Sequence, residues 1–245
     1  MSGKTGPDII ESGLVLCLDA ANKNSYRGSG TTWTDLSGNG NNGTLTNGPT
    51  FNAGNMGSIV FDGTDDYISI GSQNIVGTGT SPFSVELCIY NTKNWGIGQY
   101  TMPFRVKQDS EFFVTLYNPS GTLLSTPIFR GYYTQWATPV IQSDFVNKWI
   151  FLNYVYNGGD KSTATSYVSY LNGVQLPTGT INNGPANGGL ASNCNIIGVD
   201  GDNGCNSINS GLLQGKISLY KLYNRVLTAS EILQNYNAVK SRFGR

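Results

Sequence analysis

Short runs of apolar or alternating residues recur along the chain about every 10 to 20 residues. Most of these runs are rich in β-branched or aromatic residues and are bounded by Gly, Asn, Asp or Pro, which is the pattern of β-strands separated by turns. This pattern is typical of an antiparallel sandwich or jelly roll. The predicted strands span residues 14–18, 58–61, 67–70, 83–90, 111–117, 149–156, 167–171, 195–199 and 216–222.

Two of these runs indicate which faces the strands bury. In residues 83–90, the apolar side chains from Phe83 to Ile89 alternate with a mixed set that includes Glu86 and Cys88, so one face is expected to point into a core. In residues 111–117 both faces are apolar, which suits a strand in the interior of a sheet.

A helix is predicted at the C-terminal end of the chain. Thr228 and Glu231 have the spacing of a capping box, in which the two side chains satisfy free backbone N–H groups of the first turn. Apolar residues then recur at helical spacing, and basic residues lie near the negative end of the helix dipole before Gly244. The apolar positions are Ile232, Leu233, Tyr236 and Val239, and the basic residues are Lys240 and Arg242. We expect this helix to lie on the sandwich.

The composition excludes several functions. The chain of 245 residues has 15 Lys and Arg, 15 Asp and Glu, 32 glycines and no histidine, and 12% of its residues are charged, compared with about 25% in an average domain. Without histidine it cannot use a Ser-His-Asp or Cys-His relay, or a histidine metal site. Nucleic-acid binding is disfavoured because the net charge is zero. An aromatic content of 11% argues for a packed core rather than disorder.

The chain is expected to form a single domain at residues 13–245, preceded by an N-terminal tail at residues 1–12. No apolar run approaches the roughly 18 residues that a transmembrane helix needs, and the segment from Met1 to Pro7 has no hydrophobic signal core. We therefore expect a chain that is made in the cytoplasm and does not enter a membrane.

The four cysteines fall into two pairs. Cys17 and Cys88 lie inside predicted strands and are expected to be free, partly buried thiols. Cys194 and Cys205 flank a stretch rich in Gly and Asn, which a disulfide between them would close. Because no signal peptide is recognised, free thiols are favoured at this pair too. No Cys-x-x-Cys spacing occurs, so a zinc site is disfavoured.

A further pattern is formed by six segments taken together in chain order. They lie at residues 13–20, 33–43, 59–67, 83–87, 170–173 and 215–232. In this order they resemble the opening, the central strand, a hairpin and the closing strand and helix of laminin-G-like, concanavalin A-like domains. The resemblance covers about residues 13 to 243 and implies an all-β fold, a two-sheet antiparallel jelly roll with one C-terminal helix. It also implies a role in glycan or partner binding and, in many members, a calcium ion.

Residues 19–26 and 234–238 are most similar to domains in structural proteins of tailed bacteriophages, many of them marine. This similarity implies a non-enzymatic virion protein on the particle exterior, a head decoration or a tail or fibre component. Such a protein would be present as a homo-oligomer or in many copies and would bind other virion proteins. The alternative is a carbohydrate-binding module or adhesin that acts on cell-surface polysaccharide. In place of the usual Trp near the end of the central strand, this chain has Cys88 or Tyr90. Residues 91–145 are longer than the family core needs and are rich in Trp and Tyr, so specificity is expected there.

Glycoside hydrolysis is disfavoured on the spacing of the carboxylates. Hydrolases of this superfamily use Glu-x-Asp-x-x-Glu on one strand, because the acid and the nucleophile must flank the bond at about 5 to 5.5 Å. That triple is absent. Asp109 and Glu111 precede a strand as turn residues would, and Glu86 has no carboxylate two residues away, so structural roles are predicted for them.

One structural calcium ion is predicted from aspartates in turns that are dense with oxygen. Calcium takes about 6 to 8 oxygen ligands from carboxylates, amide side chains and backbone carbonyls. The candidate ligands are Asp19, Asp35 and Asp62. The alternative is that these are ordinary turn residues, since Asp before Gly is common in turns.

Five aromatic residues lie in loop-like sequence rich in Gly, Gln and Thr, and are the candidate binding residues. Sugar sites stack aromatic rings on the pyranose, but protein interfaces and local cores use the same side chains. An interface is favoured over a glycan site, and the local core remains the third interpretation. The residues are Trp95, Tyr100, Tyr132, Tyr133 and Trp136.

Overall fold

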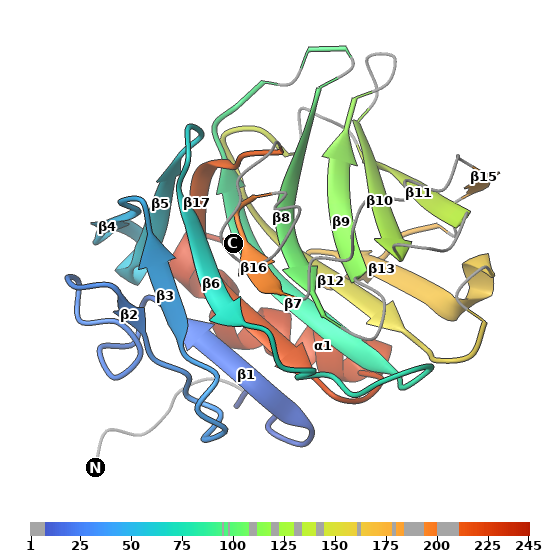
Figure 1. Ribbon diagram of the computed structural model, residues 1–245, viewed down its shortest axis with the longest axis horizontal. Coiled ribbons are helices and arrows are strands. Elements are labelled where there is room, and N and C mark those ends of the chain that lie inside the picture. The colour runs from blue at the N-terminus through green and yellow to red at the C-terminus, as the bar shows by residue number, and fades with distance from the viewer. Residues whose placement is uncertain are drawn as a thin grey trace.

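A computed structural model shows two antiparallel β-sheets packed face to face, with one helix on the outside of one sheet (Figure 1). The structure describes residues 8–94, 96–97, 99–107, 112–118, 123–129, 134–140, 145–160, 163–177, 180–183, 194–199 and 211–245. Within these residues, no helix is long and apolar enough to span a membrane.

The sheet nearer the helix, here called the back sheet, has eight strands in the described part of the chain, in the order β14-β13-β12-β7-β17-β5-β4. The eighth strand, β1, shares one edge of β17 with β5, because β5 pairs with the first half of β17 and β1 with the second half. The strands are β1 (Leu14–Asp19), β4 (Thr50–Asn52), β5 (Ser58–Asp62), β7 (Phe83–Asn91), β12 (Trp149–Tyr156), β13 (Tyr167–Leu171), β14 (Val174–Gln175) and β17 (Gln214–Tyr223).

The opposite sheet, here called the front sheet, has nine strands among the described residues, in the order β15-β11-β10-β9-β8-β16-β6-β3-β2. They are β2 (Thr32–Trp33), β3 (Gly43–Thr46), β6 (Tyr67–Gly71), β8 (Tyr100–Val106), β9 (Phe112–Tyr117), β10 (Leu123–Phe129), β11 (Thr134–Val140), β15 (Thr180–Asn183) and β16 (Asn195–Ile197). The helix is α1 (Ala229–Val239), and short 3-10 turns are η1 (Gly54–Met56), η3 (Ala164–Ser166) and η4 (Lys240–Phe243). All nine strands predicted from the sequence are confirmed.

The core lies between the two sheets and has the composition that the alternation predicts. Phe83, Val85, Leu87 and Ile89 of β7 are fully buried in one cluster that also contains apolar side chains of the front sheet. Strand β9 lies between β8 and β10, which confirms that it is an interior strand. Burial of these aliphatic and aromatic groups supplies the main favourable free energy of the fold.

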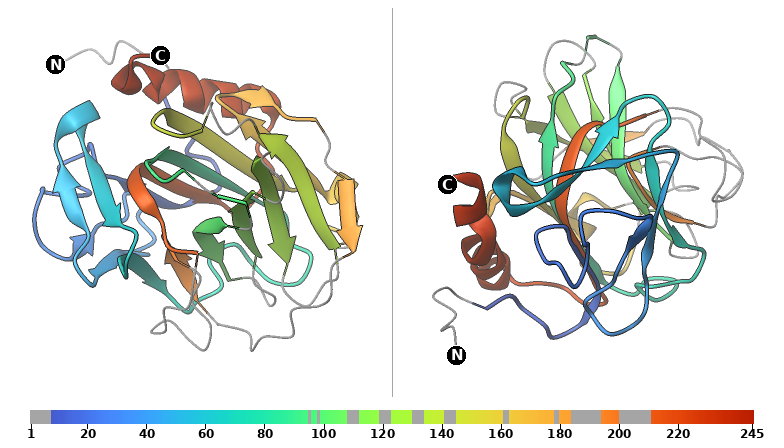
Figure 2. Two further views of the ribbon diagram at one scale, coloured as in Figure 1. Left: turned by 90° about the horizontal axis from the view of Figure 1, so that it is seen from above. Right: turned by 90° about the vertical axis from the view of Figure 1, so that its left-hand side faces the viewer.

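The outer face of β7 is buried as well. Ser84, Glu86 and Cys88 are at most 1% exposed, because α1 and η4 lie across this face of the back sheet (Figure 2). Cys88 packs there with Val239 of the helix. The sequence predicts the helix on the sandwich, but it does not show that this mixed strand face becomes a second, smaller core.

The predicted capping box is present at the start of α1. The Thr228 Oγ1 atom accepts a hydrogen bond from the N–H of Glu231 at 3.3 Å, and the Glu231 Oε2 atom accepts one from the N–H of Thr228 at 2.8 Å. Arg225 adds an ion pair to the same carboxylate, with a closest distance of 2.7 Å. The start of the helix is therefore stabilised by hydrogen bonds to its backbone N–H groups and by an ion pair.

The described end of the predicted tail is fastened to this helix. The N–H of Ile10 donates to Asn235 Oδ1 at 2.8 Å, and the Tyr223 hydroxyl donates to the carbonyl of Ile10 at 3.0 Å. Gln234 of α1 donates to the carbonyl of Asp8. Residues 8–12 therefore pack on the domain, although the sequence analysis assigns them to a tail.

Two of the three cysteines in the described residues are free. Cys17 and Cys88 are buried free thiols, as predicted, and burial raises the pKa of Cys17 to about 12. Cys194 is disulfide-bonded, so the expectation of a free thiol there is wrong. Cys205, the partner that the sequence analysis considers, lies outside the described residues.

The substitution Glu231→Gln tests the cap. The hydrogen bonds from Arg225 hold the pKa of Glu231 at about 2, below its usual 4.5. Because the folded-state pKa is the lower one, the carboxylate stabilises the fold above about pH 4.5, and this contribution is lost as the pH falls towards about 2. We expect the variant to be about 1 kcal/mol less stable at pH 7 by denaturant unfolding. A loss that persists unchanged to the acid end of this range would contradict the assignment.

Candidate functional site

A buried ion pair lies at the centre of the outer face of the back sheet. Lys221 of β17 and Glu86 of β7 are register partners, and their side chains are 1% and 0% exposed. The Nζ of Lys221 lies 2.6 Å from the Oε1 of Glu86. Two charges out of water are tolerated only when they are paired and hydrogen-bonded, so the surroundings of this pair matter.

The second oxygen of Glu86 receives two amide donors. Asn235 of α1 donates to Oε2 at 2.9 Å, and Asn153 of β12 donates to the same atom at 3.2 Å. Asn235 also donates to the hydroxyl of Tyr223 at 3.1 Å. Burial, reinforced by the charge of Glu86, raises the pKa of Tyr223 well above its usual value, so this hydroxyl stays protonated. Glu86 is a structural carboxylate, as predicted, and no substrate can reach it.

The substitution Glu86→Gln separates a structural role from a catalytic one. It leaves the Lys221 ammonium buried without a counter-charge, so we expect a loss of about 3 to 5 kcal/mol in the free energy of unfolding. The exposed Glu11→Gln is the matched control, for which a change within about 0.5 kcal/mol is expected. A fully stable Glu86→Gln protein that loses a glycan-hydrolase activity of the wild type would overturn the structural assignment.

Two of the predicted calcium ligands, Asp35 and Asp19, already form hydrogen bonds or an ion pair with other residues of the chain. Asp35 accepts hydrogen bonds from the N–H groups of Cys17, Ser37 and Asn41 and from the hydroxyl of Ser37, at 2.8 to 3.0 Å. It thereby holds its loop against the edge of β1. Asp19 binds Arg242 through both carboxylate oxygens, at 2.9 and 2.8 Å. The structure does not bring Asp19, Asp35 and Asp62 together, because these internal partners hold the first two in place.

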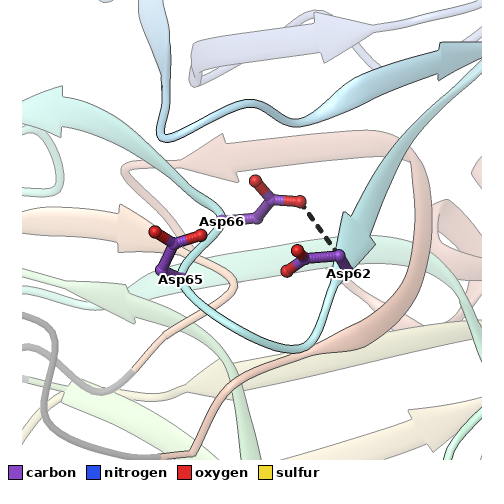
Figure 3. A group of neighbouring side chains, drawn as sticks. All are labelled: Asp62, Asp65 and Asp66. Atoms are coloured by element: carbon purple, nitrogen blue, oxygen red, sulfur yellow. Dashed lines mark hydrogen bonds between the residues drawn. The ribbon is translucent and has the colours of Figure 1, made fainter.

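The third candidate, Asp62, belongs to a different group of acids. Asp62, Asp65 and Asp66 lie at the turn between β5 and β6, and each offers a carboxylate oxygen within 4.8 Å of the others (Figure 3). Burial raises the pKa of Asp66, and the charges of Asp62 and Asp65 add to this, while a hydrogen bond from the N–H of Asp62 opposes it. Asp65 and Asp66 are not among the ligands predicted from the sequence, although three acids within five residues of one turn are a signal that could indicate them.

These three aspartates are the residues that would hold a calcium ion, because they form an oxygen-only set of the kind this cation prefers. The calcium site itself stays a prediction. At free calcium about a hundred times the dissociation constant, we expect the melting temperature to rise by about 5 to 10 °C. Asp65→Asn is expected to remove the gain and Glu11→Gln to keep it. A melting temperature that is the same in excess calcium and excess chelator would contradict the prediction.

All five candidate aromatic residues fall in the long segment that builds one half of the front sheet. Residues 91–145 contain strands β8, β9, β10 and β11, which lie side by side. Tyr100 is half-buried at the start of β8, opposite Tyr117, and Trp136 lies in β11, opposite Ile181 of β15. Both were expected in loops, but the β-branched and aromatic residues of this segment extend the sheet instead. Trp95, Tyr132 and Tyr133 lie outside the described residues.

Comparison with solved structures finds the same fold in the binding domains of larger proteins. One is the binding domain of botulinum neurotoxin DC in complex with rat synaptotagmin II, with a TM-score of 0.62 and 16% identity over 94% of this chain and 52% of that chain. Another is the binding domain of Paraclostridial Mosquitocidal Protein 1, with a TM-score of 0.60 and 16% identity over 93% of this chain and 52% of that chain. The chain spans about half the length of these binding domains.

This chain also matches another solved domain over the whole length of that domain. It is domain 4 of AbnA, a GH43 extracellular arabinanase from Geobacillus stearothermophilus, in complex with arabinotriose. The TM-score is 0.58 and the identity 19%, over 93% of this chain and 100% of that chain. At these identities the likeness shows the fold alone.

A search of curated proteins finds no match to the sequence. The family model described as the concanavalin A-like lectin/glucanases superfamily matches residues 62–233. This range extends from the end of β5 into α1 and contains the central strands of both sheets. The chain therefore belongs to the concanavalin A-like lectin/glucanases superfamily.

Proposed function

We propose that this domain is a non-enzymatic binding module that recognises its ligand with the half of the front sheet formed by β8, β9, β10 and β11. The observation that carries the proposal is the burial of Glu86. This carboxylate is fully buried under α1 and neutralised by Lys221, so Glu86 is not available for chemistry on a glycan, which supports a binding role rather than a hydrolytic one.

The segment that builds this half of the front sheet supplies the right side chains for binding. Residues 91–145 hold Trp95, Tyr100, Tyr132, Tyr133 and Trp136, and aromatic residues are enriched in both protein interfaces and sugar sites. The arabinanase domain and the neurotoxin binding domain share the fold while bound to arabinotriose and to synaptotagmin II. These neighbours support binding as the role of this chain as well.

We place the module on the exterior of a bacteriophage particle, as a head decoration or as a tail or fibre component. The similarity of residues 19–26 and 234–238 to phage structural proteins supports this setting. A surface with few charges and many hydroxyl and amide groups suits a protein repeated on a crowded particle. Its partners would then be other virion proteins, with surface glycan as a second ligand, and it would be present as a homo-oligomer or in many copies.

Mass spectrometry of purified particles tests the virion setting. We expect peptides of this chain in particles that remain after density-gradient purification, at an abundance comparable with other structural proteins. Particles that infect normally and lack the protein would contradict the proposed location, but not the binding role of the domain.

A glycan array tests the alternative, a carbohydrate-binding module or adhesin. If the front sheet binds sugar, one saccharide class is retained, and Trp136→Ala or Trp95→Ala weakens its binding at least about fivefold, because each ring contributes about 1 kcal/mol or more. Tyr236→Ala, an aromatic change on the helix side, is the matched control and is expected to bind as the wild type does. Equal losses in all three variants would contradict a site on the front sheet.

A further inference from the structure

The buried network under α1 holds an amine, a carboxylate and a carboxamide in contact with one another. They belong to Lys221, Glu86 and Asn235, which are at most 1% exposed. These residues come from β17, β7 and α1, and α1 lies across the outer face of the back sheet (Figure 2). An amine that attacks a carboxamide forms a new amide bond and releases ammonia. A covalent link between the sheet and the helix therefore needs no oxidant and no other reagent.

One carboxylate holds both reacting groups. The Nζ of Lys221 lies 2.6 Å from Oε1 of Glu86, and the Nδ2 of Asn235 donates to Oε2 of Glu86 at 2.9 Å. The amine and the amide are thus separated by the width of a single carboxylate group. Lysine has a flexible four-carbon stem, which lets its nitrogen move the short distance to Cγ of Asn235. Groups held this close react readily, because the entropy of bringing them together is already lost.

The carbonyl group of Asn235 is prepared for attack. Its Oδ1 accepts the N–H of Ile10 at 2.8 Å, and the hydroxyl of Tyr223 fixes Ile10 by donating to its carbonyl at 3.0 Å. A backbone N–H in this position stabilises the negative charge that develops on the oxygen during attack. Asn153 is the other amide at Glu86, but its Oδ1 has no hydrogen-bond partner among the described residues. Asn235 is therefore the better electrophile.

We propose that Lys221 and Asn235 form an intramolecular amide bond, with Glu86 as the proton carrier. Glu86 takes a proton from the Lys221 ammonium, and the neutral Nζ attacks Cγ of Asn235. Glu86 then gives this proton to Nδ2 of Asn235 and takes a second proton from Nζ, while the Cγ–Nδ2 bond breaks and ammonia leaves. The products are a neutral amide, ammonia and a protonated Glu86, so atoms and charge balance and nothing is oxidised or reduced.

The environment favours this reaction. Two ions are costly to keep out of water, and the bond removes both buried charges of the Lys221–Glu86 pair. Exclusion of solvent also protects the new bond from hydrolysis. The ion pair is the state of the chain before the bond forms, and the bond then fastens α1 to β17. This cross-link is independent of ligand recognition by the front sheet.

Mass spectrometry of the full chain, reduced and denatured after purification, tests the proposal. We expect the mass to be lower by one ammonia than the mass calculated from the sequence. Trypsin is expected to leave Lys221 uncut, because its ammonium has become an amide, and to release residues 217–225 joined to residues 226–240. Recovery of these segments as separate linear peptides overturns the proposal, as does a link from Lys221 to Asn153.

Two variants and a control locate the bond. Lys221→Arg keeps a cation beside Glu86, but a guanidinium stays charged and does not attack, so the ammonia loss is expected to disappear. Asn235→Ala removes the electrophile and is expected to have the same effect. Asn237→Ala, the matched control on α1, has no described hydrogen bond to Glu86 and is expected to keep the ammonia loss. Persistence of the joined peptides in Lys221→Arg or Asn235→Ala overturns the proposal. The tryptic map of the wild type decides the question even where a variant fails to fold.

Discussion

The arrangement of the helix side depends on one buried ion pair. Removing the Glu86 carboxylate and the Lys221 ammonium from water costs several kcal/mol for each ion, and only close pairing and full hydrogen bonding offset that cost. Asn235 supplies part of this bonding from α1, so the helix must sit where its amide reaches Glu86. Asn235 also holds Ile10. The pair therefore couples the two ends of the described chain across the back sheet.

Much of the fold could be predicted from the local pattern of the sequence. The strands that could not be predicted have a physical feature that hides them from this pattern. The period-2 alternation in β7 and the Thr228 cap are local signals, and both are confirmed. Among the strands that the sequence does not predict, β8, β10 and β11 each contain a proline, at Pro103, Pro127 and Pro139, and proline cannot donate to a strand ladder. Pairing with neighbours on both sides outweighs this local defect in β10, which lies between β9 and β11.

The candidate sites were harder to predict than the strands. Local sequence cannot distinguish an aspartate that binds a metal ion from one that only stabilises a turn. Asp35 and Asp62 both precede turns, yet Asp35 is saturated by N–H and hydroxyl donors of its own protein, whereas Asp62 joins Asp65 and Asp66. A groove beside α1 was not predictable at all. It is lined by four separate parts of the chain, residues 8–22, 36–37, 219–221 and 238–242, and only the docking of the helix brings Glu11 and Ala238 to one cavity.

A double-mutant cycle on Glu86 and Lys221 tests the central claim most directly, with denaturant unfolding at pH 7 as the readout. If the ion pair fixes the helix side, Glu86→Gln and Lys221→Met each destabilise the protein strongly, because each leaves one charge buried alone. The double variant, with no buried charge, is then more stable than either single variant. Losses that simply add in the double variant would contradict the claim.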